Sequence, residues 1–223
     1  MSEDPGTPGQ RLFPEYSRLA GMYRNEVEGL TENQLDRRRP EKSWGLWSVR
    51  DQVSHMAMVN YRWYLGNWGP ILFGGEWPRD KSLADTGGAD RKMDPERFHT
   101  MADLLDALED GFNLAWEILE KETQASLREK ALSRRVPRDY RWPSGDAMRE
   151  WTENISLKAH PGRYWRDEKD PDLFHYNLEY TFRHVSWEAY AHLKTIQKHK
   201  EAEGLPPSGV IPDEGYLRLL TWE

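Results

Sequence analysis

The chain has 223 residues, a length that suits one domain with insertions, and its 37% hydrophobic content, rich in tryptophan and tyrosine, is enough for a packed core. A formal net charge of −7 repels phosphate, so we expect no nucleic-acid partner. Cysteine is absent, which excludes disulfides, thiolate nucleophiles and cysteine-ligated metal sites.

The N-terminal segment MSEDPGTPGQ has neither the charged nor the apolar stretch of a secretion signal, and we predict that residues 1–10 form a flexible leader. No apolar run elsewhere approaches the ~18–20 residues that a membrane span needs. The sequence therefore favours a cytoplasmic protein without a membrane partner.

Two amphipathic helices are expected in the first third of the chain. After Pro14, apolar residues recur every three or four positions, which predicts a helix with one buried face. They are Leu19, Met22, Tyr23, Val27 and Leu30. The second helix is expected to begin at Ser48, which suits an N-cap, and Asp51 favours the helix N-terminus. Glycines and a proline between 66 and 70 predict its end.

The rest of the chain predicts two more long helices, separated by loops. Residues 74–94 form a polar, glycine-rich loop, and Asp94-Pro95 then opens a third helix. Its buried face consists of Met101, Leu105, Leu108, Phe112, Ala115 and Leu119. A fourth helix is expected from Pro171 or Asp172 to about Glu203, where Gly204 suits the C-terminal cap.

These elements predict an all-α fold, an up-and-down four-helix bundle with long inserted loops. The bundle would form a single domain over residues 11–223, with insertions at about 74–94 and 134–170 and at most a short helix near 147–152. The apolar tail GYLRLLTWE is expected to pack back onto the domain.

The last helix places an ionisable pair on its apolar face. Glu188 and His192 lie four residues apart there, among the side chains of Leu178, Phe182, Val185, Ala189, Leu193 and Ile196. Two interpretations stay open: a buried, hydrogen-bonded structural pair, or two neighbouring ligands of one metal ion. His184, one turn earlier, is a candidate second-shell residue or substitute ligand.

A third ligand is expected from the second helix. His55 borders its apolar face, and metal sites in bundles use side chains from facing helices. With Glu188 and His192 it would form a set of two histidines and a carboxylate, which leaves coordination positions open for water or substrate. The remaining histidines are expected to be structural or solvated: His99, His160, His175 and His199.

The 134–170 insertion is rich in arginine and aromatic residues. Its aromatic side chains could cover a pocket or pack the loop, and its arginines could bind a substrate anion or belong to a solvated surface. The residues concerned are Arg134, Arg135, Arg138, Arg141, Trp142, Tyr164 and Trp165.

Several segments resemble the DinB/YfiT-like family. WSVRDQVSHMAMVNYRWY resembles its second helix, HVSWEAYAHLKTIQKHKEAEGLPP its last helix, and LTENQLDRRRPEKSW the linker between its first two helices. The likeness covers most of residues 15–125 and 172–208. It implies a four-helix bundle, often dimeric, with metal ligands at His55, Glu188 and His192, where Glu188 replaces the histidine that is usual in the family.

The resemblance implies a divalent-metal-dependent enzyme acting on a small molecule, either a thiol-dependent transferase or isomerase or a hydrolase. The expected metal is zinc or nickel, with iron or manganese as alternatives, and the nucleophile is either a low-molecular-weight thiol co-substrate or a metal-bound hydroxide. A homodimer is the expected assembly. The alternative is a non-catalytic ligand-binding or dimerisation bundle with a degenerate metal site.

Overall fold

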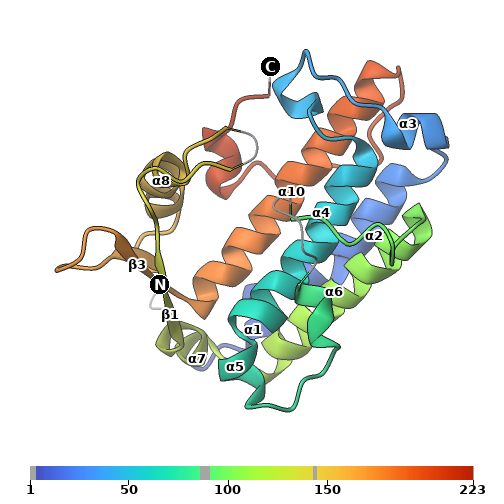
Figure 1. Cartoon of the computed structure of the whole chain (residues 1–223). Helices are drawn as coiled ribbons and strands as arrows, with labels where there is room; N and C mark the ends of the chain where they lie inside the picture. The colour runs from blue at the N-terminus through green and yellow to red at the C-terminus, as the bar shows by residue number, and fades with distance from the viewer. Residues whose placement is uncertain (1–3, 86–90, 143–144, 223) are drawn as a thin grey trace. The chain divides into compact units, whose positions relative to one another are not determined.

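The structure is a computed structural model that describes residues 4–85, 91–142 and 145–222. The described chain is mostly helical and contains a small antiparallel sheet (Figure 1). It divides into two compact units. Unit 1 comprises Met1–Pro14 and Glu117–His184, and unit 2 comprises Glu15–Trp116 and Val185–Glu223.

Most helical elements belong to one unit, and two long helices cross from one unit to the other. The helical elements of unit 2 are α2 (Tyr16–Val27), α3 (Glu32–Asp36), η1 (Ser43–Gly45), α4 (Val49–Tyr61), η2 (Arg62–Asn67), α5 (Gly69–Phe73), η3 (Lys81–Ala84) and η5 (Gly215–Leu219). Those of unit 1 are α1 (Gly9–Leu12), α7 (Gln124–Glu129), α8 (Met148–Trp151), η4 (Thr152–Ser156) and α9 (Leu157–Ala159). The unit boundaries fall within α6 (Met101–Lys121) and α10 (Leu178–Ala202). Across the part of the chain that is described, every helix is too short or too polar to cross a membrane.

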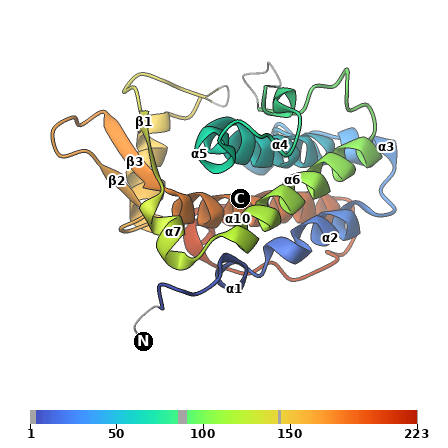
Figure 2. The ribbon, with the colours of Figure 1, turned by 90° about the horizontal axis from the view of Figure 1, so that it is seen from below.

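Helices α2 and α4 and the unit-2 parts of α6 and α10 lie side by side, as Figures 1 and 2 show from two directions. Their inward side chains form the core of unit 2. It includes Leu19, Tyr23, Val53, Met56, Leu108, Phe112, Leu193 and Ile196, all at most 1% exposed. The apolar spacing predicted these buried faces.

Helix α4 begins as the sequence predicts. The Ser48 hydroxyl accepts a hydrogen bond from the Asp51 backbone N–H, and the Asp51 carboxylate accepts one from the Ser48 N–H. This capping box satisfies two backbone donors at the start of the helix. A π-helical turn, η2, continues the helix to Asn67, within the stretch between 66 and 70 where the sequence predicts its end.

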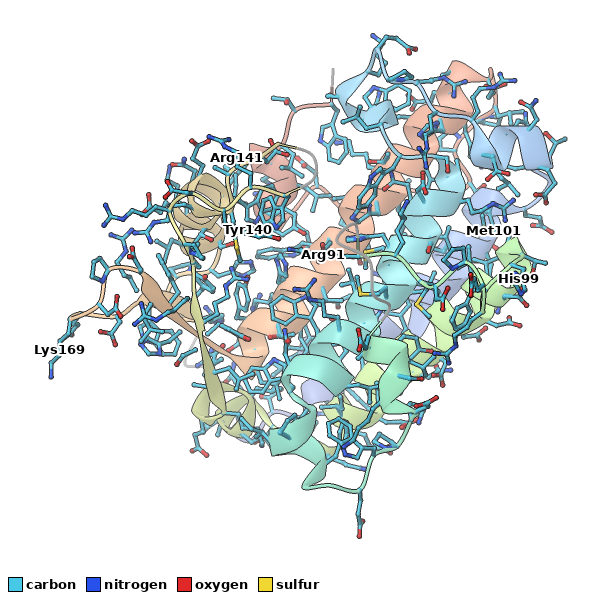
Figure 3. The ribbon with its side chains drawn as sticks, in the orientation of Figure 1. Arg91, His99, Met101, Tyr140, Arg141 and Lys169 are labelled. Carbon is cyan, nitrogen blue, oxygen red and sulfur yellow. The ribbon has the colours of Figure 1, made fainter. Side chains whose placement is uncertain are left out.

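The third long helix begins later than predicted. Asp94 caps only a turn, whereas the Thr100 hydroxyl accepts from the Asp103 N–H at 3.1 Å and the Asp103 carboxylate accepts from the Thr100 N–H at 2.8 Å. This pair of reciprocal hydrogen bonds fixes the start of α6 at Met101, which is labelled with its neighbour His99 in Figure 3.

The all-α prediction is wrong for unit 1, which contains three strands. They are β1 (Ala131–Arg135), β2 (Tyr164–Arg166) and β3 (Leu173–Asn177), in the antiparallel order β1-β3-β2. In β3, Phe174 and Tyr176 are buried while Leu173 and His175 are half-buried, the alternation of a strand with one covered face. These residues were predicted to start the fourth helix, which instead begins at Leu178.

The expected flexible leader is hydrogen-bonded from Pro5 onward. The Pro5 and Thr7 carbonyls accept from the backbone N–H groups at the start of α7, and the Gly9 N–H donates to the Glu122 carbonyl at 2.8 Å. This part of the N-terminal segment is therefore held within unit 1, while residues 1–3 lie outside the described residues.

The C-terminal segment of unit 2 folds back after α10, as the tail's composition predicts. Gly204 has φ 73°, which glycine adopts without strain, and the Leu205 N–H donates to the Lys200 carbonyl. The buried Glu26 carboxylate then binds the Lys200 ammonium and the Ser208 N–H. Further on, Tyr216 and Leu217 in η5 are 2% exposed.

Candidate metal centre

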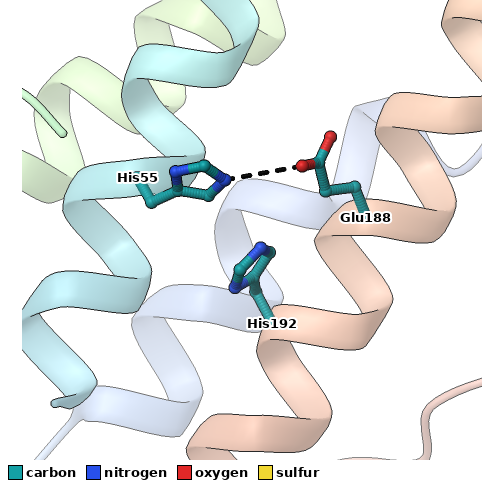
Figure 4. Close-up of side chains that lie close together, drawn as sticks. All are labelled: His55, Glu188 and His192. Carbon is teal, nitrogen blue, oxygen red and sulfur yellow. Dashed lines mark hydrogen bonds and ion pairs between the residues drawn. The ribbon is translucent and has the colours of Figure 1, made fainter. Parts of the chain in front are cut away.

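Three side chains of unit 2 converge between α4 and α10 (Figure 4). His55 projects from α4, and Glu188 and His192 project from successive turns of α10. One donor atom from each lies within 4.8 Å of the other two, so the group could hold a metal ion. The structure thus brings together the three residues that the sequence analysis selected.

One distance within the group, that between His55 and Glu188, suits two ligands of a small divalent cation. His55 Nε2 and Glu188 Oε1 are 3.4 Å apart. In a tetrahedral zinc site with bonds of about 2.0–2.1 Å, two ligand atoms lie about 3.3 Å apart. A charge-assisted N–H···O hydrogen bond is shorter, about 2.7–2.9 Å. The observed separation is therefore closer to that of two ligands of one ion than to that of a direct ion pair.

A backbone carbonyl fixes the orientation of His55. His55 Nδ1 lies 2.8 Å from the Arg91 carbonyl oxygen, which can only accept, so Nδ1 carries a proton and donates. In the neutral ring the lone pair is then on Nε2, which faces Glu188. Metal-ligating histidines are commonly held in this way, through the ring nitrogen that does not bind the metal.

The segment that supplies this carbonyl is anchored to α4. The Lys92 ammonium binds Asp51 at 2.9 Å, and the Met93 N–H donates to the Ser54 hydroxyl at 3.0 Å. Arg91, labelled in Figure 3, has φ 56°, a left-handed conformation that is costly for a residue with a side chain. These two contacts to the first turns of α4 hold the segment so that the Arg91 carbonyl lies against His55.

A side-chain amide orients His192 in the same manner. His192 Nδ1 hydrogen-bonds the Gln52 amide oxygen, which leaves Nε2 for the centre of the group. Burial, and secondarily the charge of His55, lowers the pKa of His192 to about 3. The ring is therefore neutral at neutral pH, the form that binds a metal.

Aromatic side chains surround the group. Trp47 stacks on His192 with 6.1 Å between ring centroids and lies 4.8 Å from the His55 ring. Tyr16 and Tyr23 are buried, and burial, with a smaller contribution from the Glu188 charge, raises the pKa of each phenol. His55 is buried, whereas Glu188 and His192 are half-buried, so the group is only partly shielded from solvent.

His184 is placed away from the role that the sequence suggested. It lies in unit 1, where its ring stacks on Tyr180 at 5.3 Å, and its donor atoms are not among those that converge with His55. The prediction of His184 as a second-shell or substitute ligand therefore lacks support from the geometry.

The other four histidines are of two kinds. His99 is exposed and His175 is half-buried between Ser133 and Asp167, as expected of solvated or structural residues. His160 and His199 are 1% and 2% exposed, so of the two expected alternatives, structural or solvated, neither residue is solvated. His199 Nε2 lies 2.9 Å from the Trp47 carbonyl oxygen and thus holds the chain beside the metal centre.

The roles of Gln52 and Arg91 as hydrogen-bond acceptors of the two histidines were not predicted from the sequence. A signal for Gln52 was present, because it lies three residues after Val49 and four before Met56, two apolar residues of the second helix. Arg91 acts through its carbonyl, which carries no sequence signal, at the end of what was predicted to be a loop.

No protein-family model, curated protein or solved structure matches this chain. The likeness to the DinB/YfiT-like family therefore stays a prediction.

Proposed function

We propose that the chain is a DinB/YfiT-like four-helix bundle and a metal-dependent enzyme that acts on a small molecule. In this proposal His55, Glu188 and His192 hold a divalent ion. The observation that carries it is the convergence of three donors in which both histidines have their other ring nitrogen occupied, by Arg91 and Gln52.

The arrangement of unit 2 supports the proposed fold. Helices α2, α4, α6 and α10 lie side by side there, and the donors come from the second and the last of these four. The family resemblance implies the same two helices as the source of ligands. Of the three strands of unit 1, β1 spans the start of the insertion at 134–170, β2 lies within it and β3 follows it.

The donor set indicates which chemistry the site supports. Two neutral imidazoles and one carboxylate suit zinc or nickel, and also iron or manganese, and leave positions open for exchangeable groups. A divalent metal bound there would lower the pKa of a bound water or thiol and so supply a nucleophile at neutral pH. Glu188 would offset one of the two positive charges.

Metal analysis of the purified chain tests this proposal. We expect close to one zinc or nickel ion per chain, lost in His55→Ala and in His192→Ala with the helical circular dichroism retained. His99→Ala is the matched control, because His99 is exposed at the start of α6, and it should keep the metal. A metal-free protein whose melting temperature does not change when zinc or nickel is added would contradict the proposal. The alternative, a non-catalytic bundle, would then be favoured.

A spectroscopic titration separates the two reaction types. In the cobalt-substituted protein, adding a low-molecular-weight thiol should produce a sulfur-to-cobalt charge-transfer band if the enzyme uses a thiol co-substrate. An unchanged spectrum would direct the search to hydrolysis by metal-bound water.

A further inference from the structure

One face of the sheet in unit 1 carries a serine, a histidine and an aspartate in a chain of hydrogen bonds. The Ser133 hydroxyl on β1 lies 2.8 Å from His175 Nδ1 on β3. On the other side of the ring, His175 Nε2 lies 2.8 Å from Oδ2 of Asp167, the residue that follows β2. The three groups stand in the order of nucleophile, base and orienting carboxylate that serine hydrolases use.

The strand register explains why these side chains meet. Ser133 and Trp165 lie directly opposite His175 on its two neighbouring strands, so the three side chains share one face of the sheet. Asp167 is two residues after Trp165 and therefore points to the same face. Ser133 is exposed and Trp165 is 38% exposed, so this face is open to a substrate from solution.

The proton positions on His175 follow from its two partners. The hydrogen bond from His175 chiefly, and then those from the backbone N–H groups of Lys169 and Asp170, lower the pKa of Asp167 to about 2. The carboxylate is therefore ionised at neutral pH and can only accept, so His175 Nε2 carries a proton and donates to it. In the neutral ring Nδ1 then has the lone pair and accepts from the Ser133 hydroxyl, as a general base must.

The hairpin between β2 and β3 holds the carboxylate in place. Asp167 Oδ1 accepts from the Lys169 N–H at 2.8 Å and from the Asp170 N–H at 2.9 Å, which leaves Oδ2 for His175. Lys169 of this hairpin is labelled in Figure 3. A carboxylate held by two backbone donors keeps the imidazole in one orientation and one tautomer, which is the part of the third group in such a triad.

The edge position of β1 supplies a donor for an oxyanion. The Val136 N–H donates to the Asp172 carbonyl at one end of the β1–β3 pair. At the other end the Leu178 N–H donates to the Lys130 carbonyl. The backbone bonds of an antiparallel pair fall on alternate residues, so the N–H of Ser133 points away from β3, to the open edge of the sheet. There it can donate to a negatively charged oxygen that forms beside Ser133 Oγ.

We propose that unit 1 is an esterase site in which Ser133 is the nucleophile, His175 the general base and Asp167 the group that orients it. Ser133 Oγ forms a bond to the ester carbonyl carbon, and its proton passes to His175 Nδ1. The bond from that carbon to the alcohol oxygen then breaks, and the departing alcohol takes the proton. Water attacks the acyl-serine in the same way, releases the carboxylic acid and restores the serine.

Trp165 indicates the class of ester. Its ring stacks on that of His175 with 5.6 Å between the centroids and is partly exposed beside the serine. An exposed indole favours stacking with a flat aromatic group. We therefore expect aryl esters to be better substrates than alkyl esters.

Labelling with a fluorophosphonate tests the proposal. Its P–F bond breaks when an activated serine oxygen binds phosphorus, whereas a serine that only serves as a structural hydrogen-bond donor does not react. We expect one label per chain, located on Ser133 by peptide mass spectrometry. Ser133→Ala should lose the label, and His175→Gln should slow labelling by about 100-fold or more. The matched controls Ser82→Ala and His99→Ala change exposed residues outside the site and should label like the wild type.

Hydrolysis of phenyl acetate in the presence of a chelator gives a second readout. Asp167→Asn should lower kcat, because an amide can hold His175 in the wrong tautomer. Trp165→Ala should raise the KM for phenyl acetate several-fold with a smaller effect on kcat, and Trp165→Phe should restore part of the loss. An unchanged KM in Trp165→Ala would overturn the assignment of Trp165.

Three results would overturn the whole site. The first is a wild-type chain that takes no label under conditions that fully label a known serine hydrolase. The second is a label that persists in Ser133→Ala. The third is loss of labelling when a chelator is added, because the reaction would then depend on a metal ion. Labelling that persists with chelator supports this site whether or not the metal-centre proposal holds.

Discussion

At the scale of single residues, the candidate metal centre depends on groups that orient the ligands. The Arg91 carbonyl and the Gln52 amide oxygen each accept from the Nδ1 of one histidine. The Nε2 of His55 then faces Glu188, and Nε2 is the His192 nitrogen that does not bond Gln52. These two acceptors therefore determine the tautomer in which each histidine is held.

We predict that Gln52→Leu weakens zinc binding by about 10- to 100-fold, because His192 loses the acceptor that fixes its ring. Gln52→Glu keeps an acceptor at the same place and should retain affinity. Competition with a chromophoric chelator measures both constants. Equal affinity in Gln52→Leu and the wild type would remove Gln52 from the site.

At the scale of elements, two glycines of unit 2 both lie within helices but have different surroundings. A Cβ atom at Gly111 in α6 would lie 2.8 Å from the Cβ of Asn60 in α4, whereas one at Gly21 in α2 would meet nothing within 4 Å. Gly111 thus allows α4 and α6 to approach closely, while Gly21 serves no packing purpose.

Alanine substitutions at these two glycines should therefore change the free energy of unfolding in opposite directions. Gly21→Ala is expected to stabilise the chain by about 0.5–1 kcal/mol, because alanine loses less conformational entropy in a helix. Gly111→Ala is expected to destabilise it by about 1–3 kcal/mol, because the added methyl group overpacks the contact with Asn60. Urea unfolding measures both, and a stabilising Gly111→Ala would contradict the close approach.

The same scale shows why one expected helix start was wrong. Residues 171–177 carry apolar side chains at spacings compatible with either a helix or a short strand. Pairing with β1 and β2 turns Phe174 and Tyr176 to the covered face of the sheet and delays α10 to Leu178. Local periodicity over so few residues does not distinguish the two structures, and long-range pairing does.

At the scale of the whole molecule, the net charge of −7 conceals an unequal distribution of charge. In unit 1 one buried carboxylate, Glu179, serves three arginines, whose charges and hydrogen bonds lower its pKa although burial acts to raise it. A lowered pKa in the folded state links stability to pH.

Because the folded pKa of Glu179 lies below the unfolded value of about 4.3, its stabilising contribution is complete above that pH. The contribution is lost as the pH falls through the folded pKa. We expect the free energy of unfolding to decrease below about pH 4.5 with a steeper slope in the wild type than in Glu179→Gln. At neutral pH, Glu179→Gln should cost about 3 kcal/mol, since it leaves three arginines without their carboxylate. Thermal unfolding from pH 3 to 7 measures this, and parallel pH profiles would contradict it.

The sequence by itself determined the long helices, the Ser48 and Gly204 caps and the three ligand candidates, because each has a local signal in spacing or residue type. His55, Glu188 and His192 were found from the apolar faces around them. The metal itself and the reaction stay predictions.

Only the tertiary structure showed that unit 1 contains strands, which groups hydrogen-bond the two histidine rings, and which arginines of the insertion form ion pairs. Arg135 and Arg138 have carboxylate partners whereas Arg134 has none among the described residues, although all three look alike in the sequence. Such distinctions depend on atoms from distant segments, and a backbone carbonyl such as that of Arg91 is the same at every position of the chain. The spacing of residues along a sequence predicts which face of a helix or strand a side chain lies on. It does not predict which groups of other segments that side chain contacts.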